Sequence, residues 1–261
     1  MNNKDTGTRY PAGTDYRPRR ERYPSAEWHL TYRCNLDCYG CNRASFLKEP
    51  HTPDMTIADA VEFIRQARDV SWEPAITITG GEPTIHPQFE QFVKLASDTY
   101  RHPVRVWSNA FAGRSRNLLE TVSKLPRVEI FHETAKPDGG KRDFTGISGW
   151  TDDCYVSPSD YGEPLRVPCY AHCSVLCGVS VDNAGYSPCA RGGPIDALLD
   201  LGVRTKRLAD LFDIEKCAEL TARLCQHCGH QTGKRENVDA CPKLFGVPVS
   251  PTWEAALKDR K

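Results

Sequence analysis

The chain has 261 residues, and its 34 lysines and arginines balance its 34 aspartates and glutamates, so the formal net charge is zero. This length suggests one or two domains with a sizeable core. The charge balance argues against a protein that binds nucleic acid mainly through phosphate contacts. The longest apolar runs fall far short of the roughly 20 residues of a membrane span. We therefore expect neither a membrane protein nor a nucleic-acid-binding protein.

The 12 cysteines fall into two groups. Cys34, Cys38 and Cys41 lie together, and the other nine all follow position 153. The first residues show no secretory signal, so we expect a reducing cytoplasm, where disulfides are rare. Clustered cysteines in that compartment are more often metal ligands than disulfides. Two metal-binding regions are therefore predicted.

The N-terminal third of the chain begins with an irregular segment and then becomes periodic. Residues 1–26 are rich in Arg, Tyr, Pro and Gly, which predicts an extended arm or lid; a disordered leader is the alternative. From residue 27 a strand is expected to end at Cys34, with Trp28, Leu30 and Tyr32 on one face. A capping box of Thr56 and Asp59 predicts a helix over 56–69.

Strands and helices are then expected to alternate. Strands are predicted at 75–79, 104–108 and 128–132, one helix opens at Pro87, and another is marked by Leu118, Val122 and Leu125. This rhythm is typical of parallel βαβ units. At most four such units fit before about residue 136, so we expect an α/β fold with a partial, open, TIM-like barrel. Residues 137–170 are predicted to be a long connection.

The first cysteine group lies at the end of a predicted strand. A closed structural zinc site needs four ligands, whereas a [4Fe-4S] cluster held by three cysteines leaves one iron open to a small molecule. The next strand ends in Gly80-Gly81-Glu82-Pro83. The glycines allow close backbone approach, and Glu82 can accept a hydrogen bond from a bound ammonium group. A zinc site with one distant fourth ligand is the alternative.

The spacing C-x3-C-x2-C, followed by G-G-E-P one βα unit later, resembles the radical S-adenosylmethionine (SAM) superfamily over residues 27 to about 136. The resemblance implies that three cysteines bind a [4Fe-4S] cluster whose open iron binds SAM. Ser108 and Asn109 stand where the family has a polar pair that meets SAM, although a helix cap or turn is the alternative. The site residues implied in this way are Cys34, Cys38, Cys41, Gly80, Gly81, Glu82, Tyr39 near the adenine, Ser108 and Asn109.

The resemblance also implies a reaction. A reduced cluster cleaves SAM to methionine and a 5'-deoxyadenosyl radical, which abstracts a hydrogen from the substrate. A one-electron donor such as flavodoxin or ferredoxin is the implied partner. The compact size and the single extension resemble the small dehydrogenases of aminoglycoside biosynthesis, which implies a small polar substrate, such as a sugar or nucleotide, and an oxidoreductase or isomerase. A maturase that modifies a peptide or protein is the alternative, and a non-catalytic iron-sulfur or zinc scaffold is a third hypothesis.

The second cysteine group spans a predicted β-hairpin between Cys177 and Cys189, with its turn at 182–185, and a short helical element near 208–212. With the later C-x2-C this order resembles the SPASM or twitch auxiliary-cluster domain. The resemblance implies one auxiliary [4Fe-4S] cluster, with Cys169 or Cys177 as alternative first ligands and a second cluster left open. A zinc ribbon of Cys217, Cys225, Cys228 and Cys241 competes. The implied auxiliary ligands are Cys173, Cys189, Cys225 and Cys228.

The expected organisation of the chain therefore has four parts. They are an arm or lid at 1–26, a radical SAM core at 27–150, a small cysteine-rich auxiliary cluster region at 151–245, and a tail at 246–261.

Overall fold

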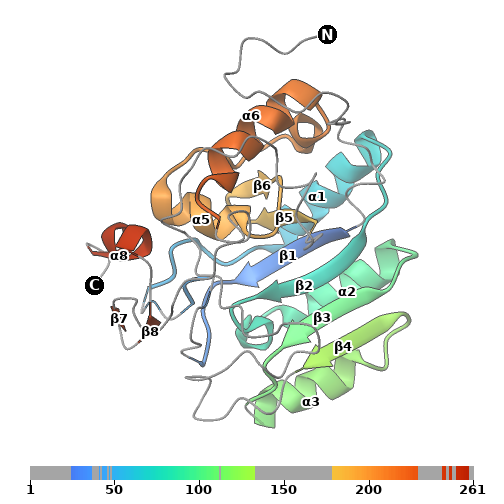
Figure 1. The fold of residues 1–261 in the computed structure, drawn as a ribbon. Helices are drawn as coiled ribbons and strands as arrows, with labels where there is room; N and C mark the ends of the chain where they lie inside the picture. Colours follow the sequence, from blue (N-terminus) through green and yellow to red (C-terminus); the bar gives the residue numbers. More distant parts are fainter. Residues whose placement is uncertain are drawn as a thin grey trace.

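The computed structural model describes residues 25–36, 41, 43–45, 47, 49–111, 113–132, 178–228, 243–244, 247–248 and 251–258. Its centre is a six-stranded sheet in the order β4-β3-β2-β1-β5-β6 (Figure 1). The first five of these strands run parallel, and β6 is antiparallel to β5. Their bounds are β1 Ser25–Thr31, β2 Ala75–Gly80, β3 Val104–Ser108, β4 Val128–His132, β5 Val179–Asp182 and β6 Gly185–Ser187.

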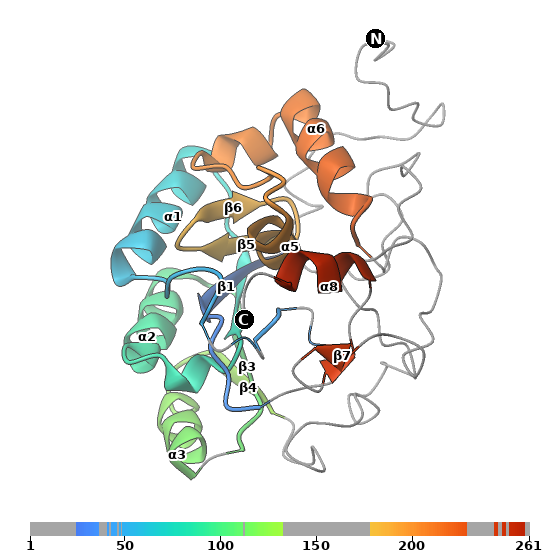
Figure 2. The same cartoon turned by 90° about the vertical axis from the view of Figure 1, so that its left-hand side faces the viewer.

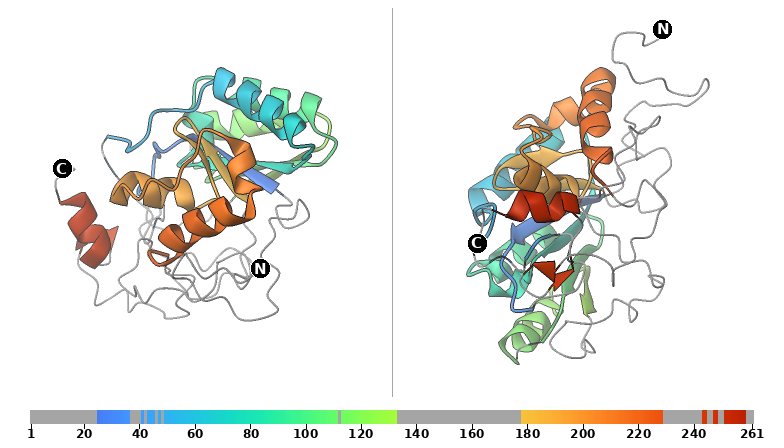
Figure 3. Two further views of the ribbon diagram at one scale, coloured as in Figure 1. Left: turned by 90° about the horizontal axis from the view of Figure 1, so that it is seen from above. Right: turned by 60° about the vertical axis from the view of Figure 1, so that its left-hand side comes forward.

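Helices cover both faces of the sheet. α1 (Ile57–Asp69), α2 (Phe89–Thr99) and α3 (Gly113–Val122) lie along one face, whereas α5 (Gly192–Leu199) and α6 (Ile214–Cys225) lie on the other (Figures 2 and 3). Short 3-10 helices occupy Pro83–Ile85 (η2) and Leu208–Leu211 (η4). The remaining elements are β7 (Lys243–Leu244), β8 (Val247–Pro248) and α8 (Pro251–Leu257). No described helix is long and apolar enough to cross a membrane.

The main core packs the sheet against α1 to α3 and extends to residues of α5, η4 and α6. Trp28 of β1 is fully buried, and its ring meets the rings of Phe63 and Phe92 edge-on at centroid distances of 5.9 and 6.3 Å. Burial of apolar side chains such as these is the main favourable contribution to the folding of the domain. The predicted capping box is confirmed, since Thr56 accepts from the Asp59 amide and Asp59 accepts from the Thr56 amide. An open, largely parallel α/β sheet is therefore confirmed.

Four details of the sequence-based prediction are wrong: the end of β1, the face of Tyr32, the start of α2 and the end of α3. β1 ends at Thr31, and the pairing register shifts between His29 and Thr31, so Tyr32 leaves the face shared by Trp28 and Leu30. Tyr32 instead donates a hydrogen bond to Asp182. The helix expected from Pro87 begins at Phe89, and α3 ends at Val122, before Leu125, because a turn at 123–127 leads directly into β4.

The predicted hairpin is present as β5 and β6, and it belongs to the core sheet. β5 pairs with β1 in parallel, with Ala26 opposite Val179 and Trp28 opposite Val181. Both valines are fully buried in the main core, because alternate residues of a strand face the same side. The hairpin lies within residues 151–245, the predicted auxiliary cluster region. The structure shows that a strand from the later part of the chain extends the sheet beyond β1.

A second, smaller core packs against the first cysteine group. Ala44 and Leu47 pack with Leu198 of α5 and Leu257 of α8, and Cys41 lies partly buried against them. Helices α5 and α8 contact each other directly. The loop that follows the first cysteines is therefore held by helices from the last third of the chain.

Candidate active site

Four predicted site residues meet where β1, β2 and β3 end. Cys34 follows β1, Glu82 follows β2, and Ser108 and Asn109 close β3. The Ser108 hydroxyl donates to Glu82 Oε1 at 2.8 Å, and the Asn109 amide N–H donates to Glu82 Oε2 at 2.7 Å. The Asn109 side-chain amide lies 3.7 Å from Cys34 Sγ. The carboxyl edge of a parallel sheet thus brings together residues that are far apart in the sequence.

The Glu82 carboxylate is fully buried and is satisfied by the chain itself. Besides Ser108 and Asn109, the backbone N–H and the hydroxyl of Thr84 donate to Oε1. The Thr84 hydroxyl also lies 2.7 Å from the Ser115 hydroxyl at the start of α3. Four donors match the roughly four acceptor positions of a carboxylate. In this structure the Glu82 carboxylate therefore joins the ends of β2 and β3, and its expected contact with SAM stays a prediction.

Gly80 and Gly81 allow the end of β2 to lie against the end of β1. A Cβ at Gly80 would stand 2.3 Å from the Thr31 carbonyl oxygen, and one at Gly81 would stand 2.1 Å from the Arg33 carbonyl oxygen. Gly80 also has a φ of +131°, which other residues rarely adopt. In place of side chains, the Gly81 and Glu82 amides donate to those two carbonyls at 2.7 and 2.9 Å. The close approach that the motif predicts is therefore made to the backbone of β1.

The described cysteines of the first group fit an iron-sulfur cluster. Cys34 and Cys41 are partly exposed, whereas Cys217, Cys225 and Cys228 are buried. The Asn109 amide near Cys34 Sγ is the kind of donor that stabilises a thiolate or a cluster sulfur. The predicted ligand Cys38 and the predicted adenine neighbour Tyr39 lie outside the described residues. Cys34 and Cys41 would hold the cluster together with Cys38.

Arg43 ties the loop after Cys41 to the sheet. Its guanidinium donates to Glu27 Oε2 of β1 at 3.0 Å and to the Ala190 carbonyl at 2.8 Å. His51 lies 2.8 Å from the Arg43 carbonyl through Nε2. Because Ala190 directly follows Cys189, one side chain connects the loop of the first cysteine group to the end of the hairpin that carries a second-group cysteine.

Glu27 and His29 lie side by side on β1 with opposite protonation preferences. Burial opposes ionisation of Glu27, yet the nearby His29 imidazole, 3.6 Å away, and the charges of Arg43 and Arg191 hold its pKa below the usual range. Burial, reinforced by the Arg43 charge, lowers the pKa of His29. At neutral pH Glu27 is therefore a carboxylate and His29 a neutral imidazole. The guanidinium of Arg43 is the charged partner of Glu27.

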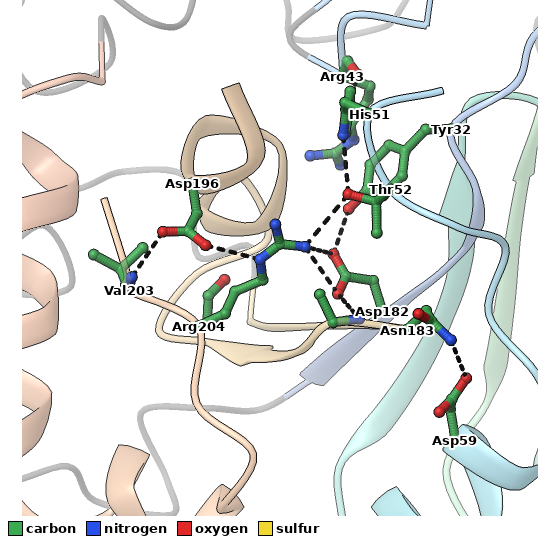
Figure 4. Close-up of polar contacts among 12 residues, drawn as sticks. Tyr32, Arg43, His51, Thr52, Asp59, Asp182, Asn183, Asp196, Val203 and Arg204 are labelled. Carbon is green, nitrogen blue, oxygen red and sulfur yellow. Dashed lines mark hydrogen bonds and ion pairs between the residues drawn. The ribbon is translucent and has the colours of Figure 1, made fainter. Parts of the chain in front are cut away.

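A buried charge network joins β1, the hairpin and the segment after α5 (Figure 4). Arg204 lies between two carboxylates, at 3.1 Å from Asp182 and 2.9 Å from Asp196. The Tyr32 hydroxyl donates to Asp182 at 2.9 Å. Burial and the Asp182 charge raise the pKa of Tyr32 well above its usual value, so the phenol remains a donor. The network also reaches Thr52, at 3.4 Å from Arg204, and so contacts the loop that follows the first cysteines.

The second cysteine group is described only in part. Cys225 and Cys228 are buried at the end of α6, where the Cys228 amide donates to the Cys225 carbonyl. Cys189 packs partly buried against the main core. Among the residues that the structure describes, no three His, Cys, Asp or Glu side chains come together as a metal site. Cys173, the fourth expected ligand, lies outside the described residues, as do Cys154, Cys169, Cys177 and Cys241.

Sequence reasoning missed several residues that shape the site. Thr84, two positions after Glu82, carries a local signal, because a carboxylate can cap a turn by accepting from the backbone N–H two residues later, as Glu82 does. Tyr32, Asp182 and Arg204 carry none, since Arg204 lies 22 positions from Asp182 and Tyr32 lies 150 positions from it. Their contacts exist only through pairing of β1 with β5.

A separate hollow of about 430 Å³ lies at the opposite edge of the sheet, where β2 and β3 begin. No predicted site residue lines it. Its lining residues are Ile64, Ala67, Arg68, Ser71, Trp72, Glu73, Thr99, Tyr100 and Arg101.

Comparison with known families agrees with the residues gathered at the carboxyl edge. Residues 28–156 match the model of the Radical SAM superfamily. The chain contains a radical SAM superfamily domain. Such a domain implies a [4Fe-4S] cluster and SAM as cofactors, and it includes Cys34, Cys38, Cys41, the Gly80 to Glu82 turn, and Ser108 with Asn109.

Three curated relatives of this radical SAM domain are enzymes. A 7,8-dihydro-6-hydroxymethylpterin dimethyltransferase of Methanocaldococcus jannaschii is 29% identical over 106 residues, which are 39% of this chain and 20% of the relative. An AdoMet-dependent heme synthase of Methanosarcina barkeri is 31% identical over 71 residues, 27% of this chain and 20% of the relative. A GTP 3',8-cyclase of Nautilia profundicola is 31% identical over 115 residues, 42% of this chain and 35% of the relative.

The chain thus covers between 20% and 35% of the length of these relatives. Among solved structures, BtrN in complex with AdoMet and 2-DOIA is 15% identical, with a TM-score of 0.49, over 79% of this chain and 92% of BtrN.

Proposed function

We propose that this chain is a radical SAM enzyme that oxidises or rearranges a small polar substrate, such as a sugar, a nucleotide or a related metabolite. One observation carries the proposal: hydrogen bonds connect four predicted site residues at one edge of the sheet, namely Cys34, Glu82, Ser108 and Asn109. When bound, the [4Fe-4S] cluster and SAM would supply reductive cleavage of SAM and hydrogen abstraction from the substrate.

The chain's own residues would bind and orient these cofactors. Cys34, Cys38 and Cys41 would provide three thiolates, and the Asn109 amide would donate toward the sulfur of Cys34. Glu82 would fix the ends of β2 and β3, so that the backbone of Gly80 and Gly81 faces the methionine part of SAM. Tyr39 would lie near the adenine, and the arm at 1–26 would exclude water.

A small-molecule substrate is favoured by the names of the relatives. The three enzymes are named for a pterin, for heme and for GTP. Modification of a peptide or protein is the alternative activity, and a scaffold without catalysis is a third. A flavodoxin or ferredoxin would deliver the electron in the reducing cytoplasm, and the reaction type would be that of an oxidoreductase or an isomerase.

We also propose an auxiliary [4Fe-4S] cluster of the SPASM or twitch type, held by Cys173, Cys189, Cys225 and Cys228. Its support is the order of these cysteines and the burial of Cys225 and Cys228, which excludes water from their thiols. The auxiliary cluster would accept an electron from the product radical or orient the substrate. The zinc ribbon of Cys217, Cys225, Cys228 and Cys241 is the competing assignment.

The test of the enzyme function is transfer of deuterium into 5'-deoxyadenosine. Anaerobically reconstituted protein receives unlabelled SAM, a reductant and size-fractionated extract from cells grown in heavy water. A mass gain of 5'-deoxyadenosine with the metabolite fraction is expected. A gain only with the peptide and protein fraction would support the alternative activity, and no 5'-deoxyadenosine with any fraction would favour the scaffold.

The Cys34→Ala variant is the control for both clusters. It should lose SAM cleavage and retain iron at the auxiliary site, which iron and sulfide analysis measures. Complete loss of iron would contradict two separate sites, and zinc at the C-terminal cysteines after native purification would support the ribbon.

A further inference from the structure

The face of β3 and β4 that lies away from α2 and α3 carries two charged and two aromatic side chains. Val104 and Val106 of β3 are fully buried toward the helices, so alternation turns Arg105 and Trp107 to the opposite face. In β4, Ile130 packs against the main core, and its neighbours Glu129 and Phe131 face away from it. We call Arg105, Trp107, Glu129 and Phe131 the inner-face quartet.

The two aromatic members of the inner-face quartet form an exposed stack. Trp107 stands directly opposite Phe131 in the β3–β4 register, and their rings stack at a centroid distance of 5.0 Å and an angle of 15°. Trp107 is 39% exposed and Phe131 37%. Large rings held parallel at the carboxyl end of two strands offer a surface on which another planar ring can stack.

The two charged members lie two positions earlier on the same strands. Arg105 stands opposite Glu129, with Nε 3.5 Å from Oε2, and both side chains are about half exposed, at 49% and 47%. An exposed ion pair of this kind contributes little to stability, so either group is free to exchange its partner for a ligand. The guanidinium donates hydrogen bonds in a plane, and the carboxylate accepts them.

The spacing of these pairs matches a planar base. Two residues along a strand span roughly 7 Å, which allows one ligand to stack on Trp107 and present its edge to Arg105 and Glu129. A guanine edge has acceptors for an arginine and N–H donors for a carboxylate. A sugar ring is puckered, so it packs on an aromatic ring only through its C–H groups and lacks the flat π-face with which a base stacks.

We propose that the inner-face quartet is a binding subsite for the purine base of a nucleoside or nucleotide substrate. The subsite adjoins the site of SAM chemistry, since Ser108 and Asn109 directly follow Trp107 in the chain. The inference rests on the proposed function for its role in turnover, and it narrows the substrate from small polar molecules to a base-containing one.

The experiment measures binding of guanosine, with ribose as the non-planar comparison, to reconstituted protein by isothermal titration calorimetry. Wild-type protein should bind guanosine and not ribose. Trp107→Ala should weaken guanosine binding about tenfold or more, as expected from the loss of one base–aromatic stack, and Glu129→Gln should weaken it less. Trp107→Phe keeps an aromatic ring and should restore most of the affinity, which separates stacking from misfolding.

Phe111→Ala is the matched control, because Phe111 is also an exposed aromatic residue, at 52%, but lies outside β3. It should leave guanosine binding unchanged. Absence of guanosine binding to wild-type protein, or equal binding by Trp107→Ala, would overturn the inference. Weakened SAM binding with unchanged guanosine binding would assign the stack to the adenine of SAM and overturn it as well.

Failure of the inference and failure of the proposed function are distinguishable. Guanosine binding that depends on Trp107, in a protein that yields no 5'-deoxyadenosine, would leave the subsite standing without radical chemistry. SAM cleavage without guanosine binding would leave the enzyme function standing and remove the subsite.

Discussion

At the scale of single residues, Glu82 shows how a motif position can have a structural role beside its expected ligand role. The carboxylate is buried and accepts from Thr84, Ser108 and Asn109, which come from two strand ends. A buried carboxylate that accepts several hydrogen bonds strongly favours its local geometry. The G-G-E-P signature therefore specifies how the strand ends are held together, beside the ligand contact that it predicts.

The Glu82→Gln variant should lose stability even without SAM. The new amide places N–H groups against donors that now meet a carboxylate oxygen, so we expect the free energy of unfolding to fall by about 2 kcal/mol. Urea denaturation of the ligand-free protein under anaerobic, reducing conditions measures this change. Glu90→Gln, at an exposed position of α2, should shift it by less than about 0.5 kcal/mol. Equal stability of the wild type and Glu82→Gln would restrict Glu82 to ligand contact.

At the scale of elements, the β1–β2 pair depends on the absence of side chains at the end of β2. The Gly81 and Glu82 amides reach the carbonyls of Thr31 and Arg33, beyond the last regular pair of the ladder. Cys34 directly follows Arg33, so this backbone contact also fixes the position of Cys34, whose Sγ lies near the Asn109 side-chain amide. The glycines thus set the position of the first predicted cluster ligand through the backbone.

The Gly81→Ala variant should separate the two strand ends. Its Cβ would stand 2.1 Å from the Arg33 carbonyl oxygen, a backbone atom that cannot rotate away. Loss of two backbone hydrogen bonds together with steric strain should lower the free energy of unfolding by about 3 kcal/mol. Gly113→Ala, which meets no atom within 4 Å at the start of α3, should leave it unchanged or slightly raise it. Similar thermal unfolding of the two variants would show that the strand ends adjust without cost.

At the scale of the whole molecule, Arg204 holds together segments that are distant in the sequence. Its guanidinium meets Asp182 at the end of β5 and Asp196 in α5, and Asp182 in turn accepts from Tyr32 after β1. Both cysteine groups flank this network, since Cys34 follows Tyr32 by two positions and Cys189 lies between the two aspartates. The network fixes the two predicted cluster regions to one sheet.

The Arg204→Met variant should leave two buried carboxylates without their cation. Breaking a buried ion pair from one side typically lowers the free energy of unfolding by roughly 3–5 kcal/mol. Chemical denaturation of the reduced protein measures the loss. Arg207→Met, whose side chain is 79% exposed beside Asp210, should change stability by less than about 1 kcal/mol. If both variants lost the same free energy of unfolding, the buried network would stabilise the fold no more than an exposed ion pair does.

Much of the fold was readable from local patterns. The four strands up to residue 132 and the helices between them follow from apolar periodicity, because burial of one face repeats every 2 or 3.6 residues. Helix α5 was not expected, since Gly192, Gly193 and Pro194 open it and disfavour helix prediction. Helix α6 carried a signal that was missed: Asp213 caps it, and Cys217, Leu220 and Leu224 recur at helical spacing.

The sequence by itself determined the α/β class, the order of the early strands and the radical SAM motif, because these depend on short-range periodicity and spacing. Only the tertiary structure decided that β5 joins β1, that Glu82 is satisfied by its neighbours, and that Arg204 lies between two aspartates. These contacts join residues separated by up to 150 positions. Local patterns carry no information on which distant partner a buried charge will meet, and chain folding alone selects it.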